Sequence, residues 1–324
     1  IEKLQQIDHD MTIGKFLELH FSDARYKSLT ESVKKFVEGY DAADIDKASA
    51  LALKEEWSND NIQGYRPEGG YAQLMNFLFS EIKKLKGKLL LSAVVKKIVW
   101  KKNDVEVTTT KEGRFTATHV LITVPAAVLK KGFVEFDPPL LPHRRALKSI
   151  EVGGVVKFLV QFRDRIWETR GQSFVRQMSD LNFLFSDAPV PTWWTQRPKE
   201  VPLLTGWLAG PGLKKLPSDN DALLQLAFKS LGYVFNSTET NLKDHVTAIK
   251  VVNWETDPFA LGAYAYATLN TPDALKTFSQ PVENTLYFAG EAFYEGAEMG
   301  TVEAALATGN RTAERIILEF AHKS

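Results

Sequence analysis

Cysteine is absent from the 324-residue sequence, so disulfide bonds and thiolate metal sites are excluded. Histidine is scarce, and its six copies show none of the spacings that are typical of metal ligands. We therefore predict no metal site and expect each histidine to be structural. The histidines are His9, His20, His119, His143, His245 and His322.

An excess of charge of either sign is also missing, since 40 basic residues balance 40 acidic ones. No stretch interleaves lysine and arginine with aromatic residues, which argues against nucleic acid as a partner. No apolar run is long enough to span a membrane. These absences lead us to expect a cytoplasmic protein.

The length of the chain suits about two domains and a sizeable core. It begins with Ile1 rather than methionine, and no signal peptide is visible. We therefore expect a chain cut from something longer.

The most informative stretch runs from Asn284 to Phe320. A short apolar run, 286–289, predicts a buried strand, and Gly290 and Glu291 follow it directly. A loop of small residues then leads into a helix whose apolar positions recur with the helical period. The expected apolar face comprises Val302, Ala305, Leu306, Gly309, Ala313, Ile316, Ile317 and Phe320.

This strand, loop and helix together predict a cofactor cradle. Gly290 allows close approach to the backbone, and the Glu291 carboxylate accepts hydrogen bonds from hydroxyl groups. The N–H groups of Thr301 and Val302, at the expected helix start, would favour negative charge. Any one of these features alone is more often part of an ordinary strand-loop-helix with a solvated glutamate.

The middle of the chain predicts a β-meander. A turn-rich break at 64–70 precedes a helix from Tyr71 to about Leu85, and a hairpin of two alternating strands follows. A buried strand over 119–124 ends at Pro125.

A second sheet is predicted from residue 153 onward. Val156, Phe158, Val160 and Phe162 form one strand face, and Lys157 lies on the other face. Without further information, such a lysine is usually a solvated charge at a sheet edge. Residues 172–202, rich in proline and aromatics, would either line a substrate mouth or pack on the surface.

The amino-acid sequences of these stretches resemble those of the flavin-containing amine oxidases, which include monoamine, polyamine and L-amino-acid oxidases. The resemblance implies an FAD site to which Gly290, Glu291, Gly300, Thr301 and Val302 contribute around the ribityl chain and flavin. It also implies that the backbone of Val95 binds the adenine and that the segment from Trp254 to Tyr264 lies against the flavin face. The catalytic residues implied are Lys157, which would reach flavin N5 through a water, and Tyr264, one wall of an aromatic cage for the amine.

Three departures from the family pattern matter. Ala263 stands where monoamine oxidases link FAD to a cysteine, so we expect FAD to be non-covalent. Ala297 stands at the second cage wall, so the cage is one-sided. No GxGxxG motif occurs, so we expect the N-terminal part of the FAD domain to be absent and this chain to bind FAD poorly, if at all.

The fold class expected is α+β / α/β, the remainder of a two-domain FAD-dependent oxidase. We assign 1–64 to a helical part of the substrate domain and 65–137 to the FAD domain. The substrate sheet and its helices take 138–270, and the C-terminal FAD-domain strand and helix take 271–324.

The predicted function is FAD-dependent oxidation of an amine by hydride transfer to flavin N5, with O2 as acceptor. The expected partners are therefore a small-molecule amine and O2, with self-association as a further expectation. Two alternatives stay open: a flavin-dependent desaturase or porphyrinogen-type oxidase, and a non-catalytic fragment that binds no flavin.

Overall fold

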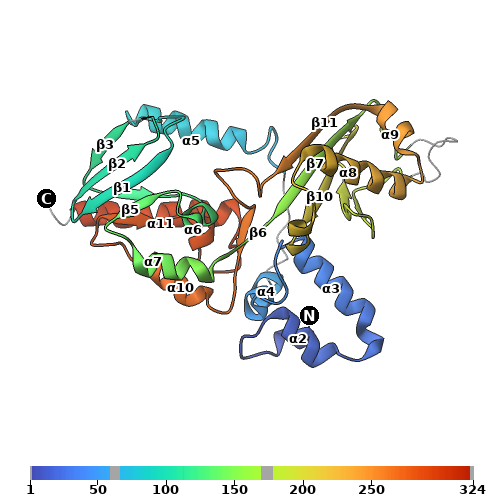
Figure 1. The fold of residues 1–324 in the computed structure, drawn as a ribbon, viewed down its shortest axis with the longest axis horizontal. Coiled ribbons are helices and arrows are strands. Elements are labelled where there is room, and N and C mark those ends of the chain that lie inside the picture. Colours follow the sequence, from blue (N-terminus) through green and yellow to red (C-terminus); the bar gives the residue numbers. More distant parts are fainter. Residues whose placement is uncertain (1, 59–65, 112, 169–177, 322–324) are drawn as a thin grey trace.

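The computed structural model describes residues 2–58, 66–111, 113–168 and 178–321. Part of the predicted turn at 64–70 and part of the aromatic stretch at 172–202 lie outside these ranges. Figure 1 shows two lobes side by side, with a group of helices below the right-hand lobe and the junction of the two. We call these the meander lobe, the sheet lobe and the helical layer.

The sheet lobe is built on a five-stranded sheet in the order β11-β7-β10-β9-β8. The second strand in this order, β7, pairs antiparallel with both β10 and β11. The lobe contains β7 (Val155–Phe162), β8 (Phe183–Phe185), β9 (Thr192–Trp194), β10 (Leu203–Ala209), α8 (Asn220–Phe235), α9 (Glu239–His245) and β11 (Val246–Asn253).

Alternation along β7 decides which face of this sheet is covered. Val156, Phe158, Val160 and Phe162 are buried in one core cluster with Leu223, Leu231 and Phe235 of α8. Asp219 caps α8 by accepting a hydrogen bond from the N–H of Ala222 at 2.9 Å. Lys157 therefore lies on the opposite face, as the sequence predicted.

The meander lobe contains two sheets. One has the order β3-β2-β1-β5, and the other is the parallel pair β4–β13. The predicted hairpin is confirmed, with Trp100 opposite Val105. The elements are α5 (Ala72–Lys84), β1 (Val95–Lys101), β2 (Asp104–Thr109), β3 (Arg114–Ala117), β4 (Val120–Ile122), α6 (Ala126–Lys131), β5 (Glu135–Asp137), α7 (Leu141–Ala146), α10 (Thr271–Phe278), β13 (Leu286–Phe288) and α11 (Val302–Ala321).

Helix α11 begins at the predicted residue, and most of its predicted apolar face is exposed rather than buried in the core. Its buried residues include Ala304 and Thr308, whereas Val302, Leu306, Ile317 and Phe320 are exposed. The side of α11 that faces β13 is held by polar contacts instead. Thr308 bonds to Gly290, and Glu319 accepts a hydrogen bond from the Tyr287 hydroxyl.

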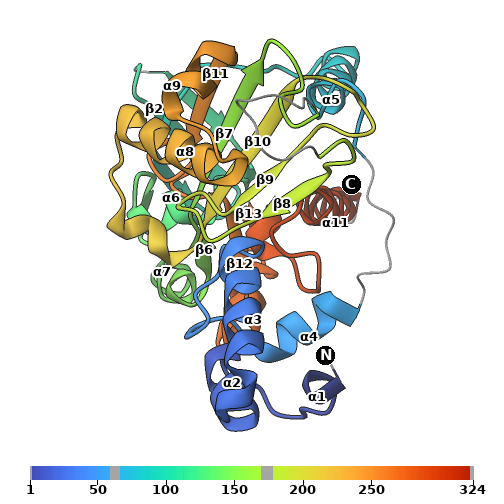
Figure 2. The ribbon, with the colours of Figure 1, turned by 90° about the vertical axis from the view of Figure 1, so that its right-hand side faces the viewer.

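The helical layer lies below the sheet lobe and the junction of the two lobes (Figure 1 and Figure 2). It contains α1 (Glu2–Gln5), α2 (Ile13–Phe21), α3 (Lys27–Gly39) and α4 (Ala50–Ser58), which share a core of their own. Thr12 caps α2 by accepting from the N–H of Lys15. A short antiparallel pair, β6 (Glu151–Gly153) with β12 (Tyr264–Tyr266), lies where the three parts meet.

Candidate functional site

A cavity of about 290 Å³ lies in the meander lobe, where the turn after β13, the loop after β4 and the middle of α11 meet. The loop before β12 closes another side. The residues around it are Thr123, Val124, Pro125, Ala126, Ala127, Val152, Ala260, Gly262, Ala263, Ala289, Gly290, Glu291, Ala292, Phe293, Ala305 and Gly309. This size is at the lower end of ordinary small-molecule sites.

Missing side chains create the cavity. Gly290 has φ +148°, a conformation that favours glycine, and a Cβ there would meet only the ring of Phe293 at 3.8 Å. A Cβ on Gly309 would meet nothing within 4 Å. With Ala305 one turn before Gly309 on α11, these residues leave a smooth wall against which a flat ring system can lie.

Glu291 provides the carboxylate of the cavity. It is half-buried, and its Oε2 accepts a hydrogen bond from the N–H of Ala265 at 3.1 Å. Burial raises the pKa of Glu291, and the hydrogen bond from Ala265 opposes that rise. The strand β12 thus fixes the carboxylate while leaving it further acceptor capacity for a hydroxyl group.

Thr308 holds the glycine turn in place, and the sequence reading missed it. Its buried hydroxyl accepts from the N–H of Gly290 at 3.0 Å and lies 3.1 Å from the carbonyl oxygen of Gly290. The sequence did contain a signal for Thr308. This threonine lies one helical turn after Ala304 and next to Gly309, and small and polar side chains on one helix face are unusual for ordinary core packing.

The start of α11 differs from the expectation of two free amide groups. The N–H of Thr301 donates to the carbonyl of Glu298 at 3.1 Å, and the Thr301 hydroxyl accepts from the N–H of Ala304. Thr301 is therefore the cap of the helix, and Val302 is its first residue. Gly300, with φ +88°, packs against β12, where a Cβ would come within 2.8 Å of the Ala265 oxygen.

Lys157 lies outside the cavity wall, on the face of the sheet that α8 leaves uncovered. It is half-buried, opposite Trp207 of β10 and Val252 of β11. Burial lowers the pKa of Lys157, and the positive charge of Arg66 lowers it further. A depressed lysine pKa gives the neutral amine a larger share near neutral pH than a solvated lysine has.

Tyr264 also lies outside the cavity, although its neighbour Ala263 is part of the wall. Its hydroxyl donates to the carbonyl oxygen of Tyr40, just after α3. Burial and the nearby Asp41 raise the pKa of the Tyr264 phenol. The tyrosine side chain therefore points to the helical layer.

The remaining predicted residues are positioned by backbone contacts. Val95 begins β1 opposite Thr109, where the register of the two strands shifts. Trp254 accepts at its carbonyl from the N–H of Gly262 at 2.9 Å, which closes the loop that delivers Gly262 and Ala263 to the cavity. The structure thus groups Gly290 and Glu291 at the cavity, and places Val95, Trp254 and Gly300–Val302 around it or further away.

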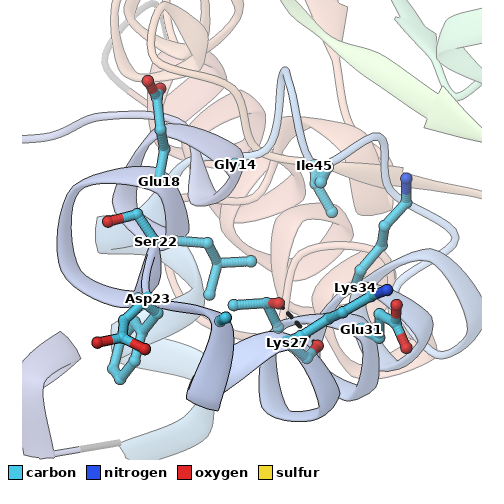
Figure 3. A pocket seen from close by; sticks show the side chains of 12 residues that line it. Gly14, Glu18, Ser22, Asp23, Lys27, Glu31, Lys34 and Ile45 are labelled. Carbon is cyan, nitrogen blue, oxygen red and sulfur yellow. Dashed lines mark hydrogen bonds between the residues drawn. The ribbon is translucent and has the colours of Figure 1, made fainter.

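A larger hollow, of about 460 Å³, lies between α2 and α3 in the helical layer. Figure 3 shows Lys34 and Glu31 on one side of it and Glu18, Ser22 and Asp23 on the other. Its charged residues form exposed ion pairs with near neighbours, such as Lys15 with Glu18 and Arg25 with Asp23. Such pairs are solvated surface features, so we do not regard this hollow as the reaction site.

Within the described ranges, no group of three or more potential metal ligands occurs. Among the same residues, no helix is both long and apolar enough to cross a membrane.

Comparison with known sequences relates the chain to polyamine oxidases and to lysine-specific histone demethylases. It is 28% identical over 321 residues to polyamine oxidase 2 of Arabidopsis thaliana, covering 95% of this chain and 61% of that protein. It is 29% identical over 235 residues to human lysine-specific histone demethylase 2, covering 70% of this chain and 28% of that protein. The chain thus spans less than two thirds of the length of each of these relatives.

Solved structures share the fold. A putrescine oxidase redesigned in cofactor binding superimposes with a TM-score of 0.76 at 17% identity, over 98% of this chain and 69% of the other. Cyclohexylamine oxidase from Brevibacterium oxydans IH-35A gives a TM-score of 0.72 at 18% identity, over 96% and 68%. The expected mixed α+β fold of the FAD-dependent oxidases is confirmed. The family model of the flavin-containing amine oxidoreductases matches residues 1–317, and the chain belongs to that family.

Proposed function

We propose that this chain carries the flavin end and the substrate face of an FAD-dependent amine oxidase. The observation that carries the proposal is the cavity walled by Gly290, Ala305 and Gly309 beside the half-buried Glu291. The room left by these small residues fits the flat isoalloxazine ring, and the carboxylate fits the ribityl hydroxyls. A bound FAD would supply the acceptor for a hydride from the carbon that bears the amine, with O2 as the final electron acceptor.

The chain's own residues have separate tasks in this proposal. Glu291 accepts a hydrogen bond from a ribityl hydroxyl, and Ala265 keeps the carboxylate in place. The start of α11 at Val302 favours negative charge that develops on the ring during the reaction. Ala263 offers no thiol, and the chain contains no cysteine, so the cofactor is held without a covalent link.

We assign Lys157 and Tyr264 to the substrate side. The depressed pKa of Lys157 lets its amine hold a water and exchange a proton with it near the reacting carbon. The ring of Tyr264 offers its face to the substrate nitrogen. In this arrangement 65–137 and 271–324 belong to the FAD domain, and 1–64 and 138–270 belong to the substrate domain.

A cavity-filling variant tests the flavin site. We expect riboflavin to bind the purified chain in calorimetric titration and Gly309→Leu to weaken that binding at least tenfold, because the leucine occupies the ring position. Ala307→Leu, at an exposed position on the opposite side of α11, serves as the matched control and should leave the affinity unchanged. Equal affinities in all three proteins would overturn the assignment of the cavity.

Catalysis has its own test. In an FAD-loaded form of the protein that oxidises amines, Lys157→Met should slow flavin reduction or reoxidation in rapid mixing while FAD stays bound. Unchanged rates would remove Lys157 from the mechanism.

A further inference from the structure

Four aromatic rings cross the uncovered face of the five-stranded sheet and end beside Lys157. They are Phe185 and Phe183 on β8, Trp194 on β9 and Trp207 on β10, and we call them the aromatic ladder. Successive ring centroids are 6.2, 5.9 and 5.9 Å apart from Phe185 to Trp207. This spacing is within the range of direct aromatic contact.

Strand register places the ladder and the lysine on one face. Phe183 lies opposite Trp194, and Trp207 lies opposite Lys157. The alternate residues, Trp193 and Phe158, point to the other face and are buried in the core with α8. The rings of the ladder therefore belong to the same surface as the proposed catalytic residue.

The outer part of the ladder is open to solvent, and the inner part is fixed. Phe183 is 52% exposed and Phe185 is 76% exposed, both on the edge strand β8. Trp207 is anchored because its indole N–H donates to the carbonyl of Gly39 at 2.8 Å. A row of exposed aromatic rings costs solvation free energy, and contiguous apolar surface of this kind marks binding sites.

The inner end of the ladder is continuous with the proposed amine position. Trp207 and Tyr264 donate to the carbonyls of consecutive residues, Gly39 and Tyr40. Near Tyr264 lie the acidic side chains of Asp41 and Glu56, which help to raise the pKa of its phenol. The inner end of the ladder therefore lies beside Tyr264, the proposed position of the amine.

Along the ladder the charges do not favour a second cation. The carboxylates that flank β8 form ion pairs, Asp180 with Arg197 and Asp187 with Lys35. A second ammonium group of a polyamine, lying along the outer rings, would find both of these carboxylates already paired.

We propose that the aromatic ladder binds the apolar tail of a monoamine substrate whose nitrogen lies at the Lys157–Tyr264 end. Three strand spacings separate β8 from Lys157 on β7, a distance of about 14 Å, which is enough for an aryl-alkyl or long alkyl chain. The identity of the head group rests on the proposed amine oxidase function, whereas the tail site is testable without flavin.

Calorimetric titration of the purified chain with n-butylamine, n-hexylamine, n-octylamine and spermidine tests the tail site. Burial of each methylene against one wall of rings should raise the affinity about two- to fourfold. Spermidine should bind more weakly than octylamine. The double variant Phe183→Ala/Phe185→Ala should reduce octylamine affinity about tenfold and abolish the dependence on chain length.

Phe133→Ala is the matched control, because Phe133 is 54% exposed but belongs to the meander lobe. Circular dichroism checks that the variants fold, which is expected for exposed edge-strand residues. Affinity that ignores chain length, spermidine that binds as tightly as octylamine, or equal effects of the double variant and the control would each overturn the tail site. Failure of riboflavin to bind, with length-dependent amine binding intact, would instead overturn the oxidase function and leave the tail site standing.

Discussion

His143 places an imidazole in the core of the meander lobe. The ring stacks on Phe288 at 4.9 Å and meets the edge of Phe278 at 5.1 Å. Neither ring nitrogen has a hydrogen-bond partner among the described residues. Burial lowers the pKa of His143 to about 4, so the folded protein holds the ring neutral.

The pH dependence of stability follows from this shift. His143 takes up a proton near pH 6.5 in the unfolded chain but only near pH 4 in the folded chain. The contribution of the neutral ring to the free energy of unfolding is therefore fully present above about pH 6.5 and is lost as the pH falls towards 4. Between pH 7 and pH 5 we expect His143 to remove about 2 kcal/mol from the free energy of unfolding. Urea denaturation of the wild type and of His143→Phe at both pH values measures this change in the free energy of unfolding.

The variant should lose that part of the pH dependence, while His9→Gln, at an exposed histidine, should keep it. The same slope of stability against pH in His143→Phe and wild type would show that the ring is not the titrating group.

Thr308 is a second residue whose removal should have a local effect. Thr308→Val keeps the shape but leaves the N–H and carbonyl of Gly290 without the hydroxyl, which should cost about 1–3 kcal/mol of stability. Riboflavin affinity should fall as the turn loosens. Thr312→Val is the control, because its hydroxyl makes only a long contact of 3.4 Å to the Phe288 carbonyl, and should cost less. Equal losses in the two variants would argue against a special role for Thr308.

The charge of Arg66 acts on Lys157 through space. Arg66→Gln removes a nearby positive charge and should therefore raise the pKa of Lys157 towards the ordinary lysine value. Titration of the isotope-labelled dimethyl-lysine signal by NMR measures this pKa. Arg25→Gln, in the helical layer, should leave it unchanged. A Lys157 signal that does not move in Arg66→Gln would show that burial alone causes the shift.

At the scale of elements, hydrophobic periodicity predicted β7 and α8 well because both bury one face against the other. It predicted the extent and the apolar residues of α11, but not the residues that hold the helix in place. The contacts that hold α11 are those of Thr308, Thr312 and Glu319, whose polar side chains bond to backbone or to tyrosine and give no apolar signal. The aromatic ladder could not be predicted from the sequence either, because strand pairing, and not spacing along the chain, brings its rings together.

The exposed apolar face of α11 leads to a prediction about association. Ile317 is 65% exposed and Leu318 is 60% exposed, and α5 in the same lobe has no buried residue. We expect the purified chain to self-associate through this surface, and Ile317→Lys/Leu318→Lys to reduce that association at unchanged stability. Leu141→Lys, at an exposed leucine of α7, is the control. Sedimentation velocity over a range of concentrations measures the effect, and a monomer throughout would contradict the prediction.

At the scale of the whole molecule, the sequence permitted the family, the mixed fold and the glycine–glutamate turn to be predicted. The cavity itself could not be predicted, because it is made by small residues from five separate segments whose meeting depends on the packing of both lobes. The positions of Lys157 and Tyr264 relative to the cavity likewise depend on how β6, β7 and β12 connect the lobes.

The central claim is that this chain supplies the flavin end of an FAD site without the glycine-rich turn that neutralises the pyrophosphate. Each missing charge-assisted hydrogen bond should cost about 1.5–3 kcal/mol, so several together weaken FAD binding by orders of magnitude. Calorimetric titration of the purified chain with FAD beside riboflavin tests this most directly. We expect FAD to bind no more than about tenfold more tightly than riboflavin. Tight, stoichiometric binding of FAD by this chain would contradict the account.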